Sequence, residues 1–503
     1  MDSGILYLYG PPASGKSTLA RRLAGEFGVE AVDLDAAIVE RAGKPIPQIF
    51  AESGEGAFRA LESETLREIA SPVVALGGGT LLDPANRAYA EEHGFVAVID
   101  ADEETLARRI EAASGTRPLG NKYRERREHY ASFAHHIAAD TRILLPGALS
   151  GALRVPASKS HLHRLSIAQF LAGAPFAPEE RGECEDIRAT RRCLAALAEA
   201  APGGAVTLDC GESGSTLRFL APLAAALGHE ASFIRRGRLA ERPMLEYHGL
   251  ESGVHTLPGD VSSQFVTGLL FALPLLKGDS RIVFSSPLQS RGYVDMTLDV
   301  VRAFGIEVVE EGGGFSIRGS QRFVAPEKAL APEGDWSGAS FWLAANKLGA
   351  RVEIENLNYS SRQPDRILAR VLENLETAGE IDISQFPDAF PALVVAAAAV
   401  RETTRIVNAA RLRIKESDRI AAMEKTMAAF GVAMESTADT ATIHGNPGPW
   451  KPCEIDAAGD HRIAMAAAIA STRAAGPVLI HGASCVAKSY PAFFDDFLAL
   501  RRG

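Results

Sequence analysis

Short, mainly apolar runs alternate with amphipathic stretches through the first 140 residues. The apolar runs are Ile5–Tyr9, Val29–Val32, Val73–Leu76 and Val96–Ile99. Between them, apolar residues recur at helical spacing and leave charge-rich outer faces, as at Ser17–Phe27, Gly56–Ala70 and Glu103–Ala112. Because short apolar strands between helices are typical of a parallel sheet covered on both faces, this pattern predicts an α/β domain.

The pattern changes near Leu144-Leu145-Pro146-Gly147. From Gly151 onward the chain is rich in Ala and Gly, and strand-like and helix-like segments of similar length follow one another. This rhythm predicts a repeated α/β unit, although the sequence alone does not align the repeats. No Gly/Ser-rich or Pro-rich tether separates the two parts, so we expect them to abut closely. The longest apolar stretch, Ala392 to Val400, is too short to span a bilayer.

Composition narrows the possible partners. The chain has 503 residues, 46% of them hydrophobic and 23% charged, and a net charge of −10. At roughly 150 residues per domain this length predicts about three domains of a soluble protein. The acidic balance disfavours nucleic acid or an anionic membrane as a partner, so an anionic ligand needs local basic clusters. Five cysteines without a Cys-x-x-Cys pair, and no visible secretory signal, lead us to expect a cytoplasmic protein with reduced thiols.

The first chemical signature is the segment Gly10 to Ser17, which matches G-x-x-x-x-G-K-[ST] between a predicted strand and a predicted helix. In such a loop backbone N–H groups surround phosphates, Lys16 reaches the terminal phosphate oxygens, and the Ser17 hydroxyl faces Mg²⁺. A glycine turn with a surface lysine is the simpler alternative. Asp33 and Asp35 follow the second strand; one carboxylate suits Mg²⁺ and the other a substrate hydroxyl, with helix capping as the alternative.

Further residues of this region form a wider set. Arg59 lies on a helix, Gly77-Gly78-Gly79 follows the third strand, Arg117 lies in a short loop, and Arg126 lies on the last helix. With the phosphate loop, this set resembles shikimate kinase over about residues 4–139. The resemblance implies ATP contacts by Ser14, Gly15, Lys16, Ser17, Thr18 and Arg117. It implies Mg²⁺ at Ser17 and Asp33, and shikimate contacts by Asp35, Arg59, Gly78, Gly79 and Arg126, with catalytic Asp35 near the reacting hydroxyl.

Two departures from the family pattern bear on kinase activity. The stretch from Arg117 to Arg126 is shorter than the usual lid, and the family's final loop and helix are missing before the chain enters its second part. An alternative is therefore a non-catalytic nucleotide-binding or structural module attached to a working second enzyme.

The second signature is a series of polar and charged clusters between residues 155 and 490. Taken singly, each cluster is typical of a helix cap or of a charged helix face exposed to solvent. The clusters are Val155–Ser160 with Arg164, Gly211–Thr216, Arg242-Pro243-Met244, Val261–Phe265, Ser290 to Tyr293, Asp335, Gln363 with Asp365, Asp388, Arg413–Arg419, Asp460-His461-Arg462 and Lys488. His461 taken alone is more typical of a hydrogen-bonded structural histidine than of a catalyst.

In this order the clusters closely resemble 5-enolpyruvylshikimate-3-phosphate (EPSP) synthase over about residues 147–501. The resemblance implies two lobes of repeated βαβαββ units, with crossovers near Pro156–Lys159 and Glu333–Asp335. The domains would be 1–145 and 146–503, with lobe one comprising 146–157 plus 333–503 and lobe two comprising 158–332. A sister family that acts on a UDP-sugar uses a loop cysteine as its acid, but Arg235 to Met244 contains none.

The same resemblance implies the transferase site. Asp388 would act as the base near the substrate hydroxyl, Glu416 would deliver and remove the methylene proton, and Lys159 would bridge both ligands. Shikimate 3-phosphate would be bound by Lys159, Ser160, Arg164, Ser262, Ser263, Ser290, Asp388 and Lys415. Phosphoenolpyruvate would be bound by Lys159, Gly214, Arg242, Gln264, Arg419, Arg462 and Lys488. Glu212 and Arg411 stand where some members of the family have an amide.

Together, the two signatures predict one bifunctional enzyme of aromatic amino acid biosynthesis. It would use ATP with Mg²⁺ to phosphorylate shikimate, and then transfer enolpyruvyl from phosphoenolpyruvate to shikimate 3-phosphate without a cofactor. The expected partners are these small molecules only, with no nucleic acid and no membrane. The oligomeric state stays open.

Overall fold

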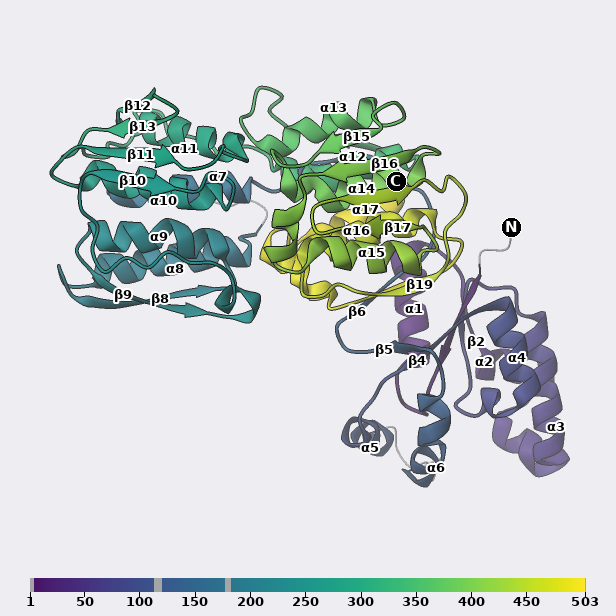
Figure 1. Ribbon diagram of the computed structural model, residues 1–503. Helices are drawn as coiled ribbons and strands as arrows, with labels where there is room; N and C mark the ends of the chain where they lie inside the picture. Colours follow the sequence, from purple (N-terminus) through teal and green to yellow (C-terminus); the bar gives the residue numbers. More distant parts are fainter. Residues whose placement is uncertain (1–3, 113–119, 177–181, 503) are drawn as a thin grey trace.

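The computed structural model describes residues 4–112, 120–176 and 182–502, which form three bodies in a row (Figure 1). The N-terminal body is a parallel sheet in the order β2-β3-β1-β4-β5. Its strands are β1 (Ile5–Tyr9), β2 (Ala31–Asp33), β3 (Val73–Ala75), β4 (Gly94–Ile99) and β5 (His135–Ile137). Its helices are α1 (Lys16–Phe27), α2 (Leu34–Ala42), α3 (Ile46–Glu68), α4 (Pro84–His93), α5 (Glu103–Ala112) and α6 (Gly120–Ala131).

The predicted parallel sheet is therefore confirmed, with small shifts at the strand ends. The largest difference lies in α3, which begins ten residues before the predicted Gly56. The helix bends at Gly54, whose φ of 79° and ψ of 174° are not helical. A residue with a side chain rarely adopts such a φ, so glycine permits the kink that joins two helical segments here.

Lobe two consists of two layers of strands and the helices that pack on them. Its elements are α7 (Lys159–Leu171), α8 (Glu185–Glu199), β8 (Ala205–Gly211), α9 (Gly214–Ala226), β9 (Glu230–Arg235), β10 (Val254–Leu257), α10 (Ser263–Ala272), β11 (Ser280–Phe284), α11 (Arg291–Ala303), β12 (Val308–Glu311) and β13 (Gly314–Ile317). One sheet has the order β10-β11-β13-β12 and the other pairs β8 with β9.

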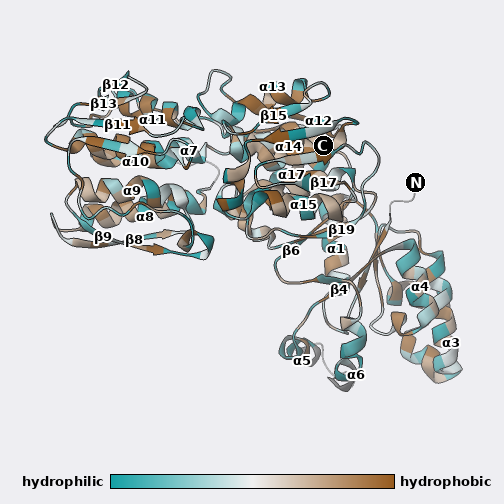
Figure 2. Cartoon of the chain, viewed as in Figure 1, coloured by the Kyte–Doolittle hydropathy of each residue, from teal (hydrophilic) through white to brown (hydrophobic). Residues whose placement is uncertain are grey.

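Lobe one repeats this architecture. Its elements are β6 (Thr141–Leu144), β7 (Ser150–Leu153), α12 (Trp336–Lys347), β14 (Arg351–Ile354), α13 (Ile367–Glu373), β15 (Glu380–Asp382), α14 (Phe390–Ala399), β16 (Thr403–Val407), α15 (Arg419–Ala429), β17 (Met434–Ser436), β18 (Ala441–His444), β19 (Cys453–Asp456), α16 (His461–Ala470), β20 (Val478–His481) and α17 (Phe493–Arg502). The apolar run at Ala392 forms most of α14, a helix in the centre of the lobe that is buried except at its last residue (Figure 2). Among the described residues no helix is long and apolar enough to cross a membrane.

The structure aligns the repeats that the sequence only suggested. The series β10-α10-β11-α11-β12-β13 and the series β15-α14-β16-α15-β17-β18 have the same connections. In each, the first two strands are parallel, and the last two are antiparallel and add to the same edge. Each series is a βαβαββ unit, so the repeated-unit fold is confirmed.

Two antiparallel chain segments connect the lobes. Ala157 pairs with Gly334 in an antiparallel bridge. Ser158 N donates to Glu333 O at 2.7 Å, and Asp335 N donates to Pro156 O at 2.9 Å. Because helices α7 and α12 start directly after these segments, the N-termini of both helices face the space between the lobes.

The N-terminal body packs on lobe one through the amino ends of its strands. Gly4 N, before β1, donates to Ala475 O at 3.2 Å, and His135 at the start of β5 lies 3.0 Å from Glu454. Strand β6 follows β5, the last strand of the first sheet, and pairs antiparallel with β20 of lobe one. The apolar cores of the two bodies are continuous at this junction.

Candidate functional sites

The phosphate loop follows β1 and ends at the N-terminus of α1. Gly15 caps the helix with a φ of 99°, a conformation that favours glycine. The Lys16 ammonium donates to Gly10 O at 2.9 Å and to Pro11 O at 2.8 Å, so the loop holds the lysine in place. Burial lowers the pKa of Lys16 to about 8, although Asp35 and Asp33 oppose the shift. This loop can bind an anion through its backbone and one positioned cation.

Asp33 has two roles at this edge of the sheet. Its carboxylate caps α2 by accepting from Ala36 N, and it also accepts from Ser17 Oγ at 2.5 Å. The capping alternative and the ligand prediction therefore do not exclude each other. Ser14, Gly15, Lys16, Ser17 and Thr18 line one pocket here. Arg117 lies outside the described residues.

Arg109 is a basic residue of this pocket that the sequence analysis missed. Its guanidinium donates to Ala13 O at 3.3 Å and to Ser14 O at 3.1 Å, across 95 residues of chain. It lies near the end of α5, where the sequence shows only an ordinary charged helix face. Its contact depends on the tertiary fold, which explains why no local pattern marked it.

Beside the loop, two arginines converge on a glycine turn after β3. A β-carbon built on Gly79 would lie 3.2 Å from Arg126 Nη1 and 3.3 Å from Arg59 Nη2. Arg126 also donates to Gly78 O at 3.0 Å, and Arg59 pairs with the buried Glu62 at 2.7 Å. A β-carbon on Gly77 would lie 3.1 Å from Asp35 Oδ1. The predicted shikimate contacts therefore lie together at the carboxyl edge of the sheet.

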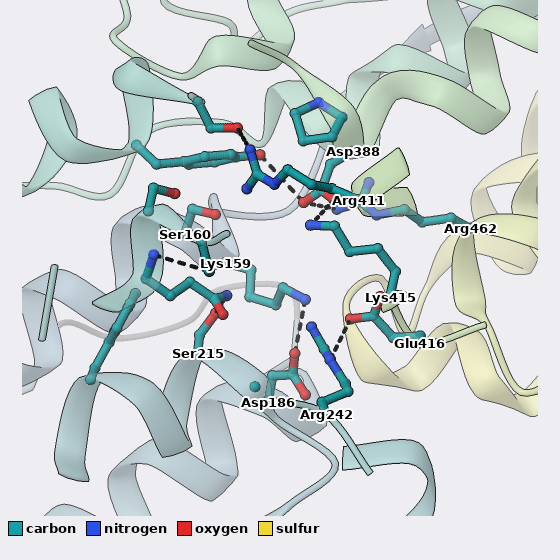
Figure 3. Close-up of a pocket in the computed structure, with 18 of the residues that line it drawn as sticks. Lys159, Ser160, Asp186, Ser215, Arg242, Asp388, Arg411, Lys415, Glu416 and Arg462 are labelled. Atoms are coloured by element: carbon teal, nitrogen blue, oxygen red, sulfur yellow. Dashed lines mark hydrogen bonds and ion pairs between the residues drawn. The ribbon is translucent and has the colours of Figure 1, made fainter. Parts of the chain in front are cut away.

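A second pocket lies between the lobes (Figure 3). It is lined by Lys159, Ser160, Arg164, Asp186, Gly214, Ser215, Phe219, Arg242, Ser262, Ser263, Gln264, Ser290, Tyr293, Pro387, Asp388, Arg411, Lys415, Glu416, Arg419 and Arg462. All but one of the residues predicted for the transferase thus line a single pocket, although they are spread over 304 positions of the chain. The exception, Lys488, lies near the pocket and contacts Glu212 at 3.1 Å.

The lining has a clear excess of positive charge. Seven cationic side chains face three carboxylates, which leaves a net charge of about four positive. Arg164 is buried and donates to Thr297, Thr267, Ser160 O and Tyr293 O, all of them neutral. Burial lowers the pKa of Arg164 to about 9. Burying cations without acidic partners costs free energy, so this pocket favours anionic ligands.

Asp388 lies at the centre of a group of cations. Its carboxylate accepts from Arg419 at 2.9 Å and from Arg462 at 3.1 Å, and lies 3.5 Å from the Lys415 ammonium. Burial alone would raise the pKa of Asp388, but Arg462, Lys415 and Arg419 bring it well below its usual range. Tyr293 OH donates to the same carboxylate at 3.3 Å.

Glu416 lies on the other side of Arg419. It accepts from that guanidinium at 2.6 Å and lies 3.7 Å from Arg242 of lobe two. Burial would raise the pKa of Glu416, but Arg419, Arg242 and Lys488 hold it well below its usual range. Two ionised carboxylates at separate points of one cationic pocket can exchange protons with two different atoms of bound ligands.

Lys159 starts helix α7 and points into the pocket. Its ammonium pairs with Asp186 at 2.8 Å. Asp186 at the start of α8, Ser215, Phe219, Tyr293, Pro387 and Arg411 line the pocket although the sequence analysis gave them no role. Arg411 donates to Gln289 Oε1 at 3.2 Å and to Ser290 Oγ at 3.1 Å, so it joins the two lobes. Ser215 and Tyr293 lie within clusters that the sequence had marked, and Arg411 had stood out only because it replaces an amide.

His461 is buried next to these residues, and neither of its ring nitrogens has a hydrogen-bond partner among the described residues. The expected hydrogen-bonded structural histidine is therefore not what the structure has here. Burial lowers the pKa of His461 well below its usual range, and the nearby cations Lys159 and Arg462 lower this pKa further. The imidazole is thus neutral beside the positive pocket.

Comparison with known proteins identifies both parts of the chain. A sequence model of EPSP synthase (3-phosphoshikimate 1-carboxyvinyltransferase) matches residues 245–497. A 3-phosphoshikimate 1-carboxyvinyltransferase from Clostridium kluyveri is 38% identical over 413 residues, covering 71% of this chain and 96% of its own length. The chain belongs to the EPSP synthase family. A relative with the same name from Clostridium acetobutylicum is 36% identical over 415 residues.

The fold of the EPSP synthase part agrees with a solved structure. EPSP synthase from Acinetobacter baumannii matches with a TM-score of 0.56 and 26% identity, covering 72% of this chain and 98% of that one. A sequence model of shikimate kinase matches residues 12–142, the part of the chain that precedes the EPSP synthase. The chain is therefore a bifunctional shikimate-pathway enzyme that joins a shikimate kinase to an EPSP synthase.

Proposed function

We propose that the kinase part transfers the terminal phosphate of ATP to the 3-hydroxyl of shikimate. The convergence of Arg59 and Arg126 at Gly79 supports a shikimate site, because two guanidinium groups suit one carboxylate. Asp35, beside the same turn, is the proposed acceptor of the hydroxyl proton. Ser14, Gly15, Lys16, Ser17 and Thr18 are the proposed ATP contacts.

The residues beside the loop suit a magnesium ion that arrives with ATP. Ser17 Oγ and Asp33 Oδ2 are two adjacent oxygen donors, and Mg²⁺ prefers oxygen ligands completed by water and substrate phosphates. Among the described residues no group of three or more His, Cys, Asp or Glu is placed to hold a metal by itself. The ion would neutralise phosphate charge, and Lys16 would orient the same phosphates.

For the second part we propose transfer of enolpyruvyl from phosphoenolpyruvate to the 5-hydroxyl of shikimate 3-phosphate. Asp388 would take the hydroxyl proton while the hydroxyl oxygen bonds to the central carbon of phosphoenolpyruvate. Glu416, ionised among these cations, would take up a proton once the ligand anions face the same cations, and would give that proton to the methylene carbon. Removal of a methyl proton by Glu416 would then restore the double bond as inorganic phosphate leaves.

The observation that carries this proposal is the excess of about four positive charges in one interlobe pocket. Two phosphorylated ligands side by side would repel each other strongly without such an excess. Ser160, Arg164, Ser262, Ser263, Ser290 and Lys415 are the proposed contacts of shikimate 3-phosphate. Gly214, Arg242, Gln264, Arg419, Arg462 and Lys488 are those of phosphoenolpyruvate, and Lys159 would contact both.

We also propose a domain boundary at about residue 145, with residues 1–145 forming the kinase domain and residues 146–503 forming the transferase. Strand β6 lies before that boundary but pairs with β20, which supports a tight junction without a linker. A cytoplasmic location is consistent with five cysteines that form no disulfide. We expect no nucleic-acid or membrane partner for this acidic chain.

One assay series tests both activities. Purified enzyme with shikimate and ATP should release ADP, and addition of phosphoenolpyruvate should then release inorganic phosphate. Lys16→Ala should abolish ADP release but leave phosphate release from supplied shikimate 3-phosphate and phosphoenolpyruvate. If ADP release at millimolar substrates is absent from the unmodified enzyme as well, the N-terminal part is a non-catalytic module and the kinase proposal is wrong.

A further inference from the structure

Arg411 is a cation of the interlobe pocket in addition to the proposed substrate contacts. It lines the pocket and lies beside Asp388 (Figure 3). Its Nη1 donates to Gln289 Oε1 at 3.2 Å and to Ser290 Oγ at 3.1 Å, and both acceptors are neutral. Its Nε is buried and has no hydrogen-bond partner among the described residues. Neither of the two hydrogen bonds thus neutralises the charge of this guanidinium.

The surroundings of Arg411 favour an anion. Burial lowers the pKa of Arg411, although Asp388, Tyr293 and Asp260 oppose the shift. Burial also lowers the pKa of Lys415 to about 8; Asp388 opposes this shift, and nearby cations that include Arg411 add to it. Two buried cations near each other and a buried N–H group without an acceptor both cost free energy. An anion with several oxygens would offset these costs.

Two neighbouring helices indicate which anionic group fits here. Ser290 is the N-cap of α11, and Ser262 is the N-cap of α10, whose first residue is Ser263. All three serines line the same pocket as Arg411. Helix N-termini bind phosphate groups, and a guanidinium adds charged N–H donors. A phosphate offers three oxygens to these donors and a carboxylate only two, so the 3-phosphate of shikimate 3-phosphate fits better than its carboxylate.

We propose that Arg411 makes the transferase pocket selective for shikimate 3-phosphate over shikimate. Its guanidinium donates to the 3-phosphate, and the two molecules differ only in this group. With shikimate in the pocket, the same guanidinium would face a neutral hydroxyl, and its buried charge would stay uncompensated. The selectivity matters in this chain because the substrate of the kinase part is the molecule that the transferase part has to reject. This inference rests on the function proposed for the interlobe pocket.

The two molecules give two constants for one pocket. Arg411→Asn introduces the amide that some members of the EPSP synthase family have at this position. At saturating phosphoenolpyruvate, the KM for shikimate 3-phosphate should rise about 10- to 100-fold, the range of a charge-assisted hydrogen bond, with kcat within three-fold. The inhibition constant of shikimate against shikimate 3-phosphate should stay within two-fold. Phosphate release is measured without ATP, so shikimate bound to the kinase part does not contribute to the readout.

Two further variants separate charge from geometry. Arg411→Lys keeps the charge but loses the planar group, so the KM for shikimate 3-phosphate should rise about three- to ten-fold, again without a change in the inhibition constant of shikimate. This variant decides the matter if Arg411→Asn does not fold. Arg401→Asn, the same change at an exposed position of lobe one, should leave every constant unchanged.

Two results would overturn the proposal. One is a KM for shikimate 3-phosphate that stays within three-fold in Arg411→Asn. The other is an equal rise of this KM and of the inhibition constant of shikimate, because Arg411 would then act on a part that both molecules share. If the unmodified enzyme releases no phosphate, the proposed function fails instead. Calorimetry of shikimate 3-phosphate binding to the full chain then decides on Arg411, and equal Kd values with and without the substitution overturn its role.

Discussion

Replacing Asp388 by Asn is expected to abolish enolpyruvyl transfer and to leave the kinase activity of this chain. The carboxylate accepts from two guanidinium groups, at 2.9 Å on Oδ1 and at 3.1 Å on Oδ2. An amide has only one oxygen, so its NH₂ group must face one of these cations. The substitution therefore removes both the proposed base and one favourable contact.

The loss of a positioned base is expected to lower kcat of enolpyruvyl transfer by about 10²- to 10⁴-fold, or roughly 3–5 kcal/mol of transition-state stabilisation. The carboxylate is ionised at neutral pH because the nearby cations hold the pKa of Asp388 well below its usual range, against the opposite effect of burial. Its contribution to stability is therefore present at neutral pH and is lost only as the pH falls through that lowered value.

The assay is release of inorganic phosphate from supplied shikimate 3-phosphate and phosphoenolpyruvate, with ADP release from shikimate and ATP as a test of folding. The second activity should stay within two-fold. Asp365→Asn is the matched control, because Asp365 contacts Tyr293 OH at 2.9 Å and Ser337 Oγ at 2.5 Å but does not line the pocket. An Asn oxygen can accept both bonds, so kcat should stay within ten-fold. Transfer by Asp388→Asn within three-fold of the unmodified rate would refute the role of this residue as the base.

Three other predictions concern the kinase part and the connection of the two activities. Because burial lowers the pKa of Lys16 to about 8, the ammonium loses its proton as the pH rises through that value, and the Kd for ADP measured by calorimetry should increase between pH 7 and 9. Lys16→Arg, which stays charged, should show a flat profile; an equal rise would contradict the assignment. Gly79→Ala places a methyl group 3.2–3.3 Å from the two converging guanidinium groups and should raise the KM for shikimate about ten-fold with little change for ATP, whereas Gly56→Ala, with open space around it, should change neither. Finally, the unmodified enzyme should make the final product from shikimate after a lag that added shikimate 3-phosphate removes, as should an equimolar mixture of Lys16→Ala and Asp388→Asn chains; a progress curve of the unmodified enzyme without a lag would indicate direct transfer.

The sequence predicted those features that depend on short segments. Strand β1 and helix α1 follow from an apolar run, a glycine loop and helical spacing, all within 25 residues. The βαβαββ architecture and the pocket members came from motifs whose order resembles known families. Their assembly into one pocket follows from the repeated unit, since helix N-termini at equivalent places face the same cleft.

Contacts between segments that are far apart in the chain could not be predicted from the sequence. Strand β6 pairs with β20 more than 330 residues later, and a four-residue run carries no information about such a partner. Asp186 and Arg411 enter the pocket because the lobes close over it, and locally each belongs to an ordinary charged segment. The Glu212–Lys488 pair likewise depends on how the two lobes meet.

The way the kinase part packs on lobe one determines where its product is released. The phosphate loop, Asp35 and the Gly77–Gly79 turn follow the carboxyl ends of the strands, whereas contacts with lobe one involve the amino ends and the end of α1 (Figure 1). We therefore expect newly made shikimate 3-phosphate to leave on the side away from lobe one and to enter solution before it reaches the transferase. On this expectation, covalent fusion gives equal numbers of the two catalysts and no direct route between their sites.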